Sequence, residues 1–321
     1  MMSKFFYLFS VLSFFMITQT FSQGCSDAGF CTMGAMRPSQ VYTKKINFRL
    51  RELELNYYSG STKLTPTINA ATVDFNFGIN DNMSMQVKLP YMWIDGNLGR
   101  TSGLGDISLS FTRNIYTTEN YHINATLGGK IPTNRSDIKE GANTDHTTTG
   151  EEAVLPMYYQ TSLGSYDIVA GGAFISRNWM FAAGVQIALN ENENTFATDD
   201  WDEYPDPHYL NSHDLATNLK RGTDIMIRAE RAFHFSKWDI RLGILPIWRI
   251  TRDEIESASG ERIKPDNTTG LALTALGNVA YHFSTTHSIK FLYGFKITDR
   301  DINPDGLTRD DVVSLAYVVR F

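Results

Sequence analysis

The sequence predicts an all-β protein, an antiparallel transmembrane β-barrel of about twelve strands with short periplasmic turns and long extracellular loops. Apolar and polar residues alternate with period two in one segment after another from residue 45 onward, as in strands with two different faces. The connections between these segments are short and long in turn. The last segment keeps its alternation up to a carboxyl-terminal phenylalanine, Phe321.

The first residues have the order of a secretory signal peptide. Lys4 precedes an apolar run at 5–17, and the small residues Thr20 and Ser22 follow that run. The run is shorter than the about 20 residues that a membrane-spanning helix needs, so we expect cleavage and export by the Sec pathway. The chain then divides into a signal peptide at 1–22, a periplasmic segment or plug at 23–44, and the barrel at 45–321.

The chain has two cysteines, Cys25 and Cys31, both just after the expected cleavage site. A local disulfide between them is the simplest interpretation in an oxidising compartment. A soft-metal site that adds the thioethers of Met33 and Met36 also has suitable ligand types. Lipid attachment to Cys25 is disfavoured, because the preceding residues lack the aliphatic side chain with which a lipobox begins.

Alternation sets which segments cross the membrane. Phe75, Phe77 and Ile79, for example, alternate with polar or small neighbours. Twelve strands are expected, near residues 45–58, 68–80, 83–93, 104–116, 121–131, 166–175, 179–189, 222–235, 238–250, 268–283, 288–297 and 311–321. An even number brings both chain ends to the periplasmic side, as a bacterial outer-membrane barrel requires.

Three features need separate treatment. Residues 155–163 look like a strand, but counting them would make the number odd, so we place them in the third outer loop as a hairpin or an inward fold. Pro246 falls inside a strand, where we expect a bulge or bend. Arg231 falls on an apolar face and should lie near the membrane edge or mark a register shift.

The long loops are expected at 59–67, 94–103, 132–165, 190–221, 251–267 and 298–310.

Charged residues should line the interior if the apolar faces meet lipid. The alternation points Asp224, Arg228 and Glu230 inward from one strand, and Asp239 and Arg241 inward from the next. One interpretation is that these residues satisfy one another as ion pairs in a filled barrel. The other is that they form a ring that selects among solutes.

One loop resembles the beginning of a calcium-binding loop. Asp301, Asn303 and Asp305 have its spacing and are followed by Gly306, and Asp299 extends the series of oxygen ligands. The closing glutamate is missing, because a valine stands at the twelfth position. A metal-free turn rich in Asp, Asn and Gly explains the segment equally well, so an extracellular calcium ion is one of two expectations.

Composition and motifs argue against several function classes. The formal net charge of −6 disfavours nucleic acid as a partner. Ser212, His213 and Asp214 are consecutive, so their side chains diverge along an extended chain and do not by themselves form a catalytic array. We therefore expect no enzyme and no cofactor other than calcium. The expected partners are outer-membrane lipid, lipopolysaccharide, a small-molecule solute, and the assembly machinery, which would recognise the final strand ending at Phe321.

Three phrases carry a resemblance to a known family. They are Gly103-Leu104-Gly105-Asp106-Ile107, Leu127-Gly128-Gly129-Lys130-Ile131-Pro132-Thr133 and Gln160-Thr161-Ser162-Leu163-Gly164-Ser165-Tyr166-Asp167. In this order they resemble the outer-membrane family named for the meta-pathway of phenol degradation, a broad group of transporters related to fatty-acid and aromatic-hydrocarbon channels. The resemblance implies a barrel that passes or binds small hydrophobic or aromatic compounds.

Three functional hypotheses follow. The first is an outer-membrane channel or transporter for small solutes, hydrophobic or aromatic ones included. The second is a surface barrel without transport, acting in adhesion or structure through its long loops. The third is an outer-membrane hydrolase.

Overall fold

The computed structural model describes Met33, Met36 and residues 48–62, 64–213, 215–257, 259–307 and 309–321. The predicted signal peptide at 1–22 and the predicted disulfide between Cys25 and Cys31 lie outside the described residues. Within the described ranges, the helices are too short or too polar to cross a membrane.

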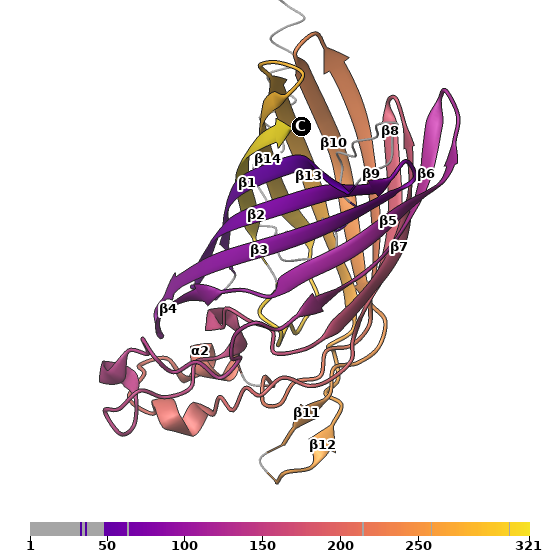
Figure 1. Cartoon of the computed structure of the whole chain (residues 1–321). Coiled ribbons are helices and arrows are strands. Elements are labelled where there is room, and N and C mark those ends of the chain that lie inside the picture. Colours follow the sequence, from indigo (N-terminus) through magenta and orange to yellow (C-terminus); the bar gives the residue numbers. More distant parts are fainter. Residues whose placement is uncertain are drawn as a thin grey trace, which may run out of the picture.

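Twelve antiparallel strands close into one barrel, which confirms the predicted fold class (Figure 1). The ring closes where β1 pairs with β15, with Leu55 opposite Tyr317. The wall strands are β1 (Arg49–Ser61), β2 (Thr67–Asn80), β3 (Met83–Gly96), β5 (Ile107–Thr117), β6 (Tyr121–Ile131), β7 (Asp167–Ser176), β8 (Trp179–Ala188), β9 (Asp224–Phe235), β10 (Trp238–Arg249), β13 (Gly270–His282), β14 (His287–Thr298) and β15 (Asp311–Arg320).

The predicted outer loop at 94–103 is wrong. β3 continues to Gly96, and β4 (Gly99–Leu104) turns back to pair with it, so that Tyr91 lies opposite Leu104. The turn residues make a tight hairpin in place of a loop, because Gly99 adopts a φ of +154° that favours glycine. Each arm of the hairpin has only a few alternating residues, so the sequence pattern does not distinguish the arms from the turn residues between them.

β4 and β5 together form one wall strand with an interruption. β4 pairs with the second half of β3, and β5 pairs with its first half at Met83–Lys88. The interruption falls at Gly105 and Asp106, within the first family-like phrase. The carbonyl of Pro90 on β3 accepts a hydrogen bond from the amide of Gly105 at 2.9 Å, so the wall stays closed at this junction.

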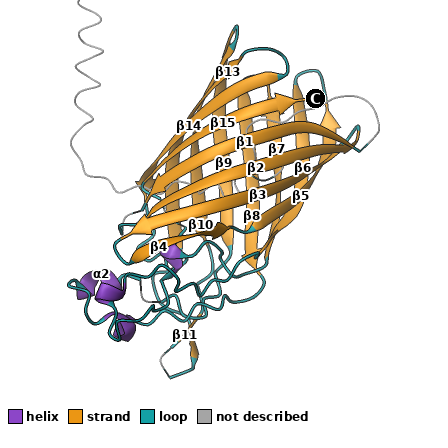
Figure 2. Cartoon of the chain, turned by 60° about the vertical axis from the view of Figure 1, so that its left-hand side comes forward, coloured by secondary structure: helices purple, strands orange, loops and turns teal. Residues whose placement is uncertain are grey.

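The two ends of the barrel differ, as the sequence predicts. Short turns join the strands at one end, which we call the turn end, and long segments join them at the other, the loop end (Figure 2). The loop end carries η3 (Thr144–His146), η4 (Met157–Tyr159), η5 (Thr198–Trp201), α2 (Pro207–Asn211) and a hairpin of β11 (Ile255–Glu256) and β12 (Arg262–Ile263). The strand-like stretch 155–163 belongs to the third loop and is buried around η4, which agrees with the expected inward fold.

Two predictions about single residues have opposite outcomes. Of the bulge or bend expected at Pro246, the bulge is wrong: β10 keeps one register with β9 on both sides of it, with Ile244 opposite Ala229 and Ile247 opposite Met226. The β9 pairing skips Leu245 and Pro246, so the missing proline N–H falls at a gap in the ladder. Arg231 lies beside the β7–β8 turn, opposite Trp179, as expected for the membrane edge.

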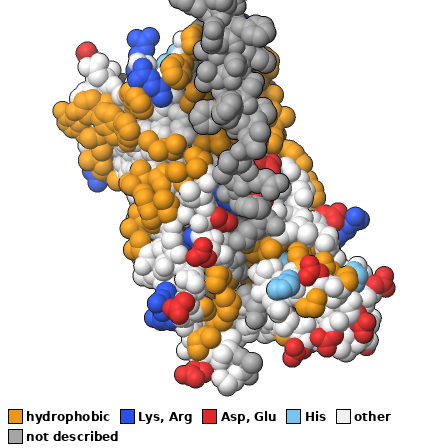
Figure 3. All heavy atoms as spheres, turned by 180° about the vertical axis from the view of Figure 1, so that it is seen from behind, with side chains coloured by type: hydrophobic (Ala, Val, Ile, Leu, Met, Phe, Trp, Pro, Cys, Tyr) orange, Lys and Arg blue, Asp and Glu red, His pale blue; other side chains and the backbone are white. Residues whose placement is uncertain are grey.

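The strands have one apolar and one polar face. Outward side chains such as Leu55, Phe111 and Phe291 are 41–47% exposed, whereas inward Glu52, Arg228 and Lys296 are 1% exposed. Hydrophobic side chains cover much of the barrel surface in Figure 3, and acidic ones gather at the loop end. Exposed apolar residues around a wall of polar inward residues are the pattern of a barrel that meets lipid outside.

Candidate functional site in the barrel lumen

The five predicted lumen residues all lie on the inward faces of β9 and β10, at two levels. Toward the turn end, Arg228 and Glu230 form an ion pair of 2.5 Å, and both side chains are at most 2% exposed. Glu230 and Asp239 are the acidic neighbours of Arg241 on β10. These contacts match the ion-pair interpretation in geometry, and a role in solute selection stays a prediction.

The other two acidic residues have partners that the sequence did not indicate. Asp239 lies 2.6 Å from Nδ1 of His234 and 2.9 Å from Nε2 of His282, near the turn end. Asp224 lies near the loop end, where it accepts hydrogen bonds from Arg249 at 2.7 and 2.8 Å. The five predicted residues therefore do not form one group, because Asp224 and Asp239 lie near opposite ends of the barrel.

Arg249 is the centre of a buried ionic cluster that sequence analysis missed. Its guanidinium binds Asp224 of the wall at 2.7 Å, and Asp253 and Asp305 from two different loops at 2.8 Å each. Each of these four side chains is at most 9% exposed. The cluster therefore ties two outer loops to the inner wall.

Charge balance decides the ionisation of the loop carboxylates in this cluster. Burial raises the pKa of Asp305, but the guanidinium of Arg249, helped by Arg300 and Arg221, outweighs burial and holds that pKa below its usual range. Burial keeps the pKa of Asp253 above its usual range despite Arg249. Asp305 thus supplies a negative charge to the cluster throughout the physiological range.

The predicted calcium loop is used differently. Asp305 faces Arg249, and Asp299 accepts a hydrogen bond from the Asn303 amide at 2.8 Å. Asp301 is exposed to solvent. Within the described residues, no group of three or more His, Cys, Asp or Glu side chains is placed to hold a metal ion. Calcium binding at this loop stays a prediction.

The three family-like phrases meet at the loop end. Ser162 Oγ and the Leu163 amide donate to the carboxylate of Asp106 at 2.6 and 3.0 Å. Thr133 Oγ1 donates to the carbonyl of Gly105 at 2.5 Å. The interrupted wall strand thus holds the third loop inside the barrel mouth, a contact that joins residues far apart in the sequence.

A second ionic group lies beside these phrases. Arg221 binds Asp167 on β7 at 2.5 Å, and the charges of Asp106 and Asp167 act on Lys130 of β6. Lys130 is 2% exposed, and its Nζ has no hydrogen-bond partner among the described residues. A buried ammonium without a partner is rare and calls for a water or a solute atom.

Aromatic side chains from the loops cover the same mouth. The buried cluster there consists of Tyr58, Ile68, Ala70, Met92, Ile94, Leu98, Leu155, Tyr158, Tyr159, Phe196, Trp201, Tyr204, Leu210 and Val312. It joins inward residues of β1–β3 and β15 to residues of the third and fourth loops. We call it the aromatic cap.

His213 lies within the aromatic cap. Its ring centroid is 4.8 Å from that of Tyr209 and 5.4 Å from that of Tyr158. Neither ring nitrogen has a hydrogen-bond partner in the part of the chain that the structure describes, and burial lowers the pKa of His213 to about 3. Ser212 Oγ instead donates to the Tyr209 carbonyl at 2.6 Å, so Ser212 and His213 are not joined as a nucleophile and base.

Met33 and Met36 lie against the inner wall. They are 2% and 0% exposed and pack in one apolar cluster. The other members of the cluster face inward from β7–β10 and β13: Val169, Ala173, Met180, Ala182, Met226, Leu245 and Leu276. Two residues of the predicted plug segment at 23–44 are therefore in contact with the lumen wall.

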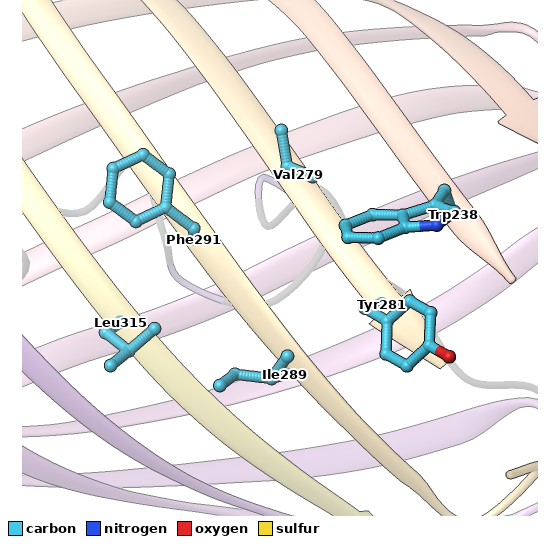
Figure 4. Close-up of a pocket in the computed structure, with 6 residues that line it drawn as sticks. All are labelled: Trp238, Val279, Tyr281, Ile289, Phe291 and Leu315. Carbon is cyan, nitrogen blue, oxygen red and sulfur yellow. The ribbon is translucent and has the colours of Figure 1, made fainter. Parts of the chain in front are cut away.

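Two hollows differ in character. A cavity of about 30 Å³ lies between Met92 of the inner wall, Thr161 of the third loop and Leu307 of the last loop. A groove of about 270 Å³ lies on the outer wall and is lined by Trp238, Val279, Tyr281, Ile289, Phe291 and Leu315 (Figure 4). The first has room for a water-sized molecule, and the second faces the membrane.

Comparison with known proteins shows the fold. No family model matches the chain, and no curated protein matches it. An outer membrane channel from Pseudomonas putida F1 shares 12% identity with a TM-score of 0.55, over 88% of this chain and 100% of the other. The NanC porin shares 9% identity (TM-score 0.44; 84% and 98% covered), and the CymD monoaromatic hydrocarbon channel 11% (TM-score 0.41; 95% and 95% covered). The class is therefore that of outer-membrane β-barrels, while the resemblance to the meta-pathway family stays a prediction.

Proposed function

We propose that the protein is a channel of the Gram-negative outer membrane that passes small solutes, hydrophobic or aromatic ones included. One observation carries the proposal: the barrel wall is apolar outside and lined inside by charged and polar side chains. Glu52, Asp74 and Lys296 are examples on three different strands, all at most 4% exposed. A solute path through a barrel requires such a polar inner wall.

Aromatic residues support the membrane placement. Tyr57 lies 6.0 Å from Trp93 toward the loop end, and Trp238 lies 4.7 Å from Tyr281 toward the turn end, measured between ring centroids. Such girdles mark the two membrane interfaces of outer-membrane barrels. On this proposal the loop end meets lipopolysaccharide, the signal peptide directs Sec export, and the strand that precedes Phe321 is read by the assembly machinery.

The lumen is narrow on this proposal, and its loop end is held closed by ordered groups. The Arg249 cluster and the aromatic cap come from loops, and Met33 and Met36 add contacts from the N-terminal segment. Passage therefore requires movement of a loop or of this segment, which we propose to act as a plug. The Pseudomonas putida F1 protein is named as an outer membrane channel, and we propose the related role here.

Conductance tests the proposal directly. The full chain is refolded, shown to be folded by heat-modifiable gel mobility, and added to planar lipid bilayers. We expect small discrete openings in the wild-type protein and more frequent ones in a variant with Met33→Ser and Met36→Ser, because serine does not hold the apolar inner wall. Absence of openings in both folded proteins would contradict the channel function.

A surface barrel without transport is the alternative, and the Arg249 cluster favours it. One guanidinium binds three carboxylates, two of them on loops, and separating these buried charges would leave them without partners. On this hypothesis the loops form a fixed platform for adhesion or structure. Silent bilayers together with binding of the folded protein to lipopolysaccharide or to whole cells would support it.

A further inference from the structure

We propose that the inner wall carries a slot for a short unbranched alkyl chain, and that the side chain of Met36 fills this slot in the structure. The inference rests on the proposed channel function, since it names the kind of solute that the same lumen takes. The slot is distinct from the predicted charged residues and lies between their two levels.

Two glycines make the slot. Gly171 of β7 and Gly184 of β8 are directly opposite each other in the wall, on the inward row that also contains Val169 and Ala182. A Cβ atom added to Gly171 would lie 2.9 Å from Sδ of Met36, and one added to Gly184 would lie closer still. Only the absence of both Cβ atoms leaves room for the thioether against the backbone.

The surroundings of the slot are apolar, although the lumen around them is not. Met226 lies opposite Gly184 on the next strand, and Leu245 belongs to the same buried cluster. The ion pair of Arg221 with Asp167 lies toward the loop end. The pair of Arg228 with Glu230 lies toward the turn end. An apolar patch between two ionic levels is unfavourable when it faces water, so it needs an apolar occupant.

The shape of the present occupant indicates the chemical class of the solute. A methionine side chain is an unbranched chain of about four heavy atoms and is close in shape to an n-butyl group. A branched chain is wider, and the backbones of Gly171 and Gly184 leave no room for the branch. Methionines also adapt their shape, and Met33, Met180 and Met226 line the patch. The slot therefore fits a solute with an n-alkyl chain of about four or five carbons, which would take the place of Met36.

Oxidation of Met36 reports on its displacement without any mutation. A buried thioether is protected from hydrogen peroxide, and an exposed one is converted to the sulfoxide. The folded full-length protein in lipid nanodiscs is treated with peroxide, and each methionine is followed by mass spectrometry. The probes are 1-pentanol, an unbranched primary alcohol, and its isomer 2-methyl-2-butanol, a branched tertiary alcohol of the same composition. Met157, 3% exposed in the third loop, is the internal reference.

We expect 1-pentanol to speed the oxidation of Met36 by about tenfold, as a local opening would, while 2-methyl-2-butanol has little effect and Met157 keeps its rate. Equal acceleration by both isomers, or none by either, would overturn the proposal. Glycine variants test the geometry. Gly184→Ala should expose Met36 without any alcohol, because the new methyl group occupies the place of its sulfur.

The matched control is Gly277→Ala on β13, where an added Cβ comes no closer than 3.9 Å to any neighbour. It should behave as the wild type, and heat-modifiable mobility shows that each variant is folded. Slow oxidation of Met36 in folded Gly184→Ala would also overturn the slot. Silent bilayers combined with isomer-selective oxidation would refute the channel function and leave the slot intact. Channel openings without isomer-selective oxidation of Met36 would support the channel function and refute the slot.

Discussion

Arg249 gives the sharpest test of how the outer loops are held. Its Nε and Nη2 donate to Asp224 at 2.8 and 2.7 Å, Nη1 donates to Asp253 at 2.8 Å, and Nη2 also donates to Asp305 at 2.8 Å. Arg249→Met keeps much of the side-chain length but leaves three buried carboxylates without their common donor. Removing one partner from a buried ion pair costs about 3–5 kcal/mol.

This cost falls on loop closure, because Asp224 belongs to the wall while Asp253 and Asp305 belong to two loops. Since each 1.4 kcal/mol is tenfold, the open fraction of these loops should rise by at least about 100-fold. Hydrogen exchange measures this open fraction at two backbone amides. The Gly222 amide donates to Asp253 at 2.6 Å, and the Leu307 amide donates to Asp305 at 3.1 Å.

The matched control is Arg252→Met, three residues further along the chain. Arg252 pairs with Asp266 at 2.9 Å, but both side chains are more than half exposed, so its loss should change exchange little. The reasoning fails if Arg249→Met exchanges at the wild-type rate at both amides, or if Arg252→Met has an equal effect.

Three further predictions concern other parts of the lumen. Burial lowers the pKa of His213 to about 3 from 6.5, so its neutral form contributes full stability above pH 6.5, and that stability is lost as the pH falls toward 3. At pH 4.5 the cap should be weakened by about 2–3 kcal/mol, seen as a change in Trp201 fluorescence that His213→Leu removes. Glu230→Gln should shift the reversal potential in a salt gradient toward anion selectivity, because Arg228 loses its neutralising partner; an unchanged potential would place the pair outside the ion path. Deleting Phe321 should reduce the heat-modifiable fraction in cells, and normal assembly would refute its role as a signal.

Period-two alternation was enough to predict the barrel, because inside and outside impose opposite chemistry on each strand. Tyr57 and Leu55 face out while Asn56 faces in, and no tertiary knowledge is needed to see it. The same rule placed Arg231 at the membrane edge, where its guanidinium stacks on Trp179, 4.8 Å from the ring centroid. Parity then excluded residues 155–163 from the wall.

The rule failed where local patterns were short or partners were distant. The strand β4 has only six residues, too few to show alternation against turn residues. Arg249 and Asp305 are 56 residues apart, and only the fold of two loops brings them together. The inward position of Asp224 was predictable from its strand, whereas the identity of its partner was not.

The two closures at the loop end respond to different conditions, and this difference bears on how a channel could open. The Arg249 cluster is buried, so added salt screens it little, and its loss requires the loops to separate. The aromatic cap contains an imidazole that is stable there only when neutral, so acid weakens the cap. Acid protonates Asp253, because burial raises its pKa, but Arg249 and Asp305 remain charged and paired. If the protein conducts, acid alone should therefore loosen the cap without freeing the loops, and full opening should need a solute or partner that competes for the carboxylates of Asp253 and Asp305.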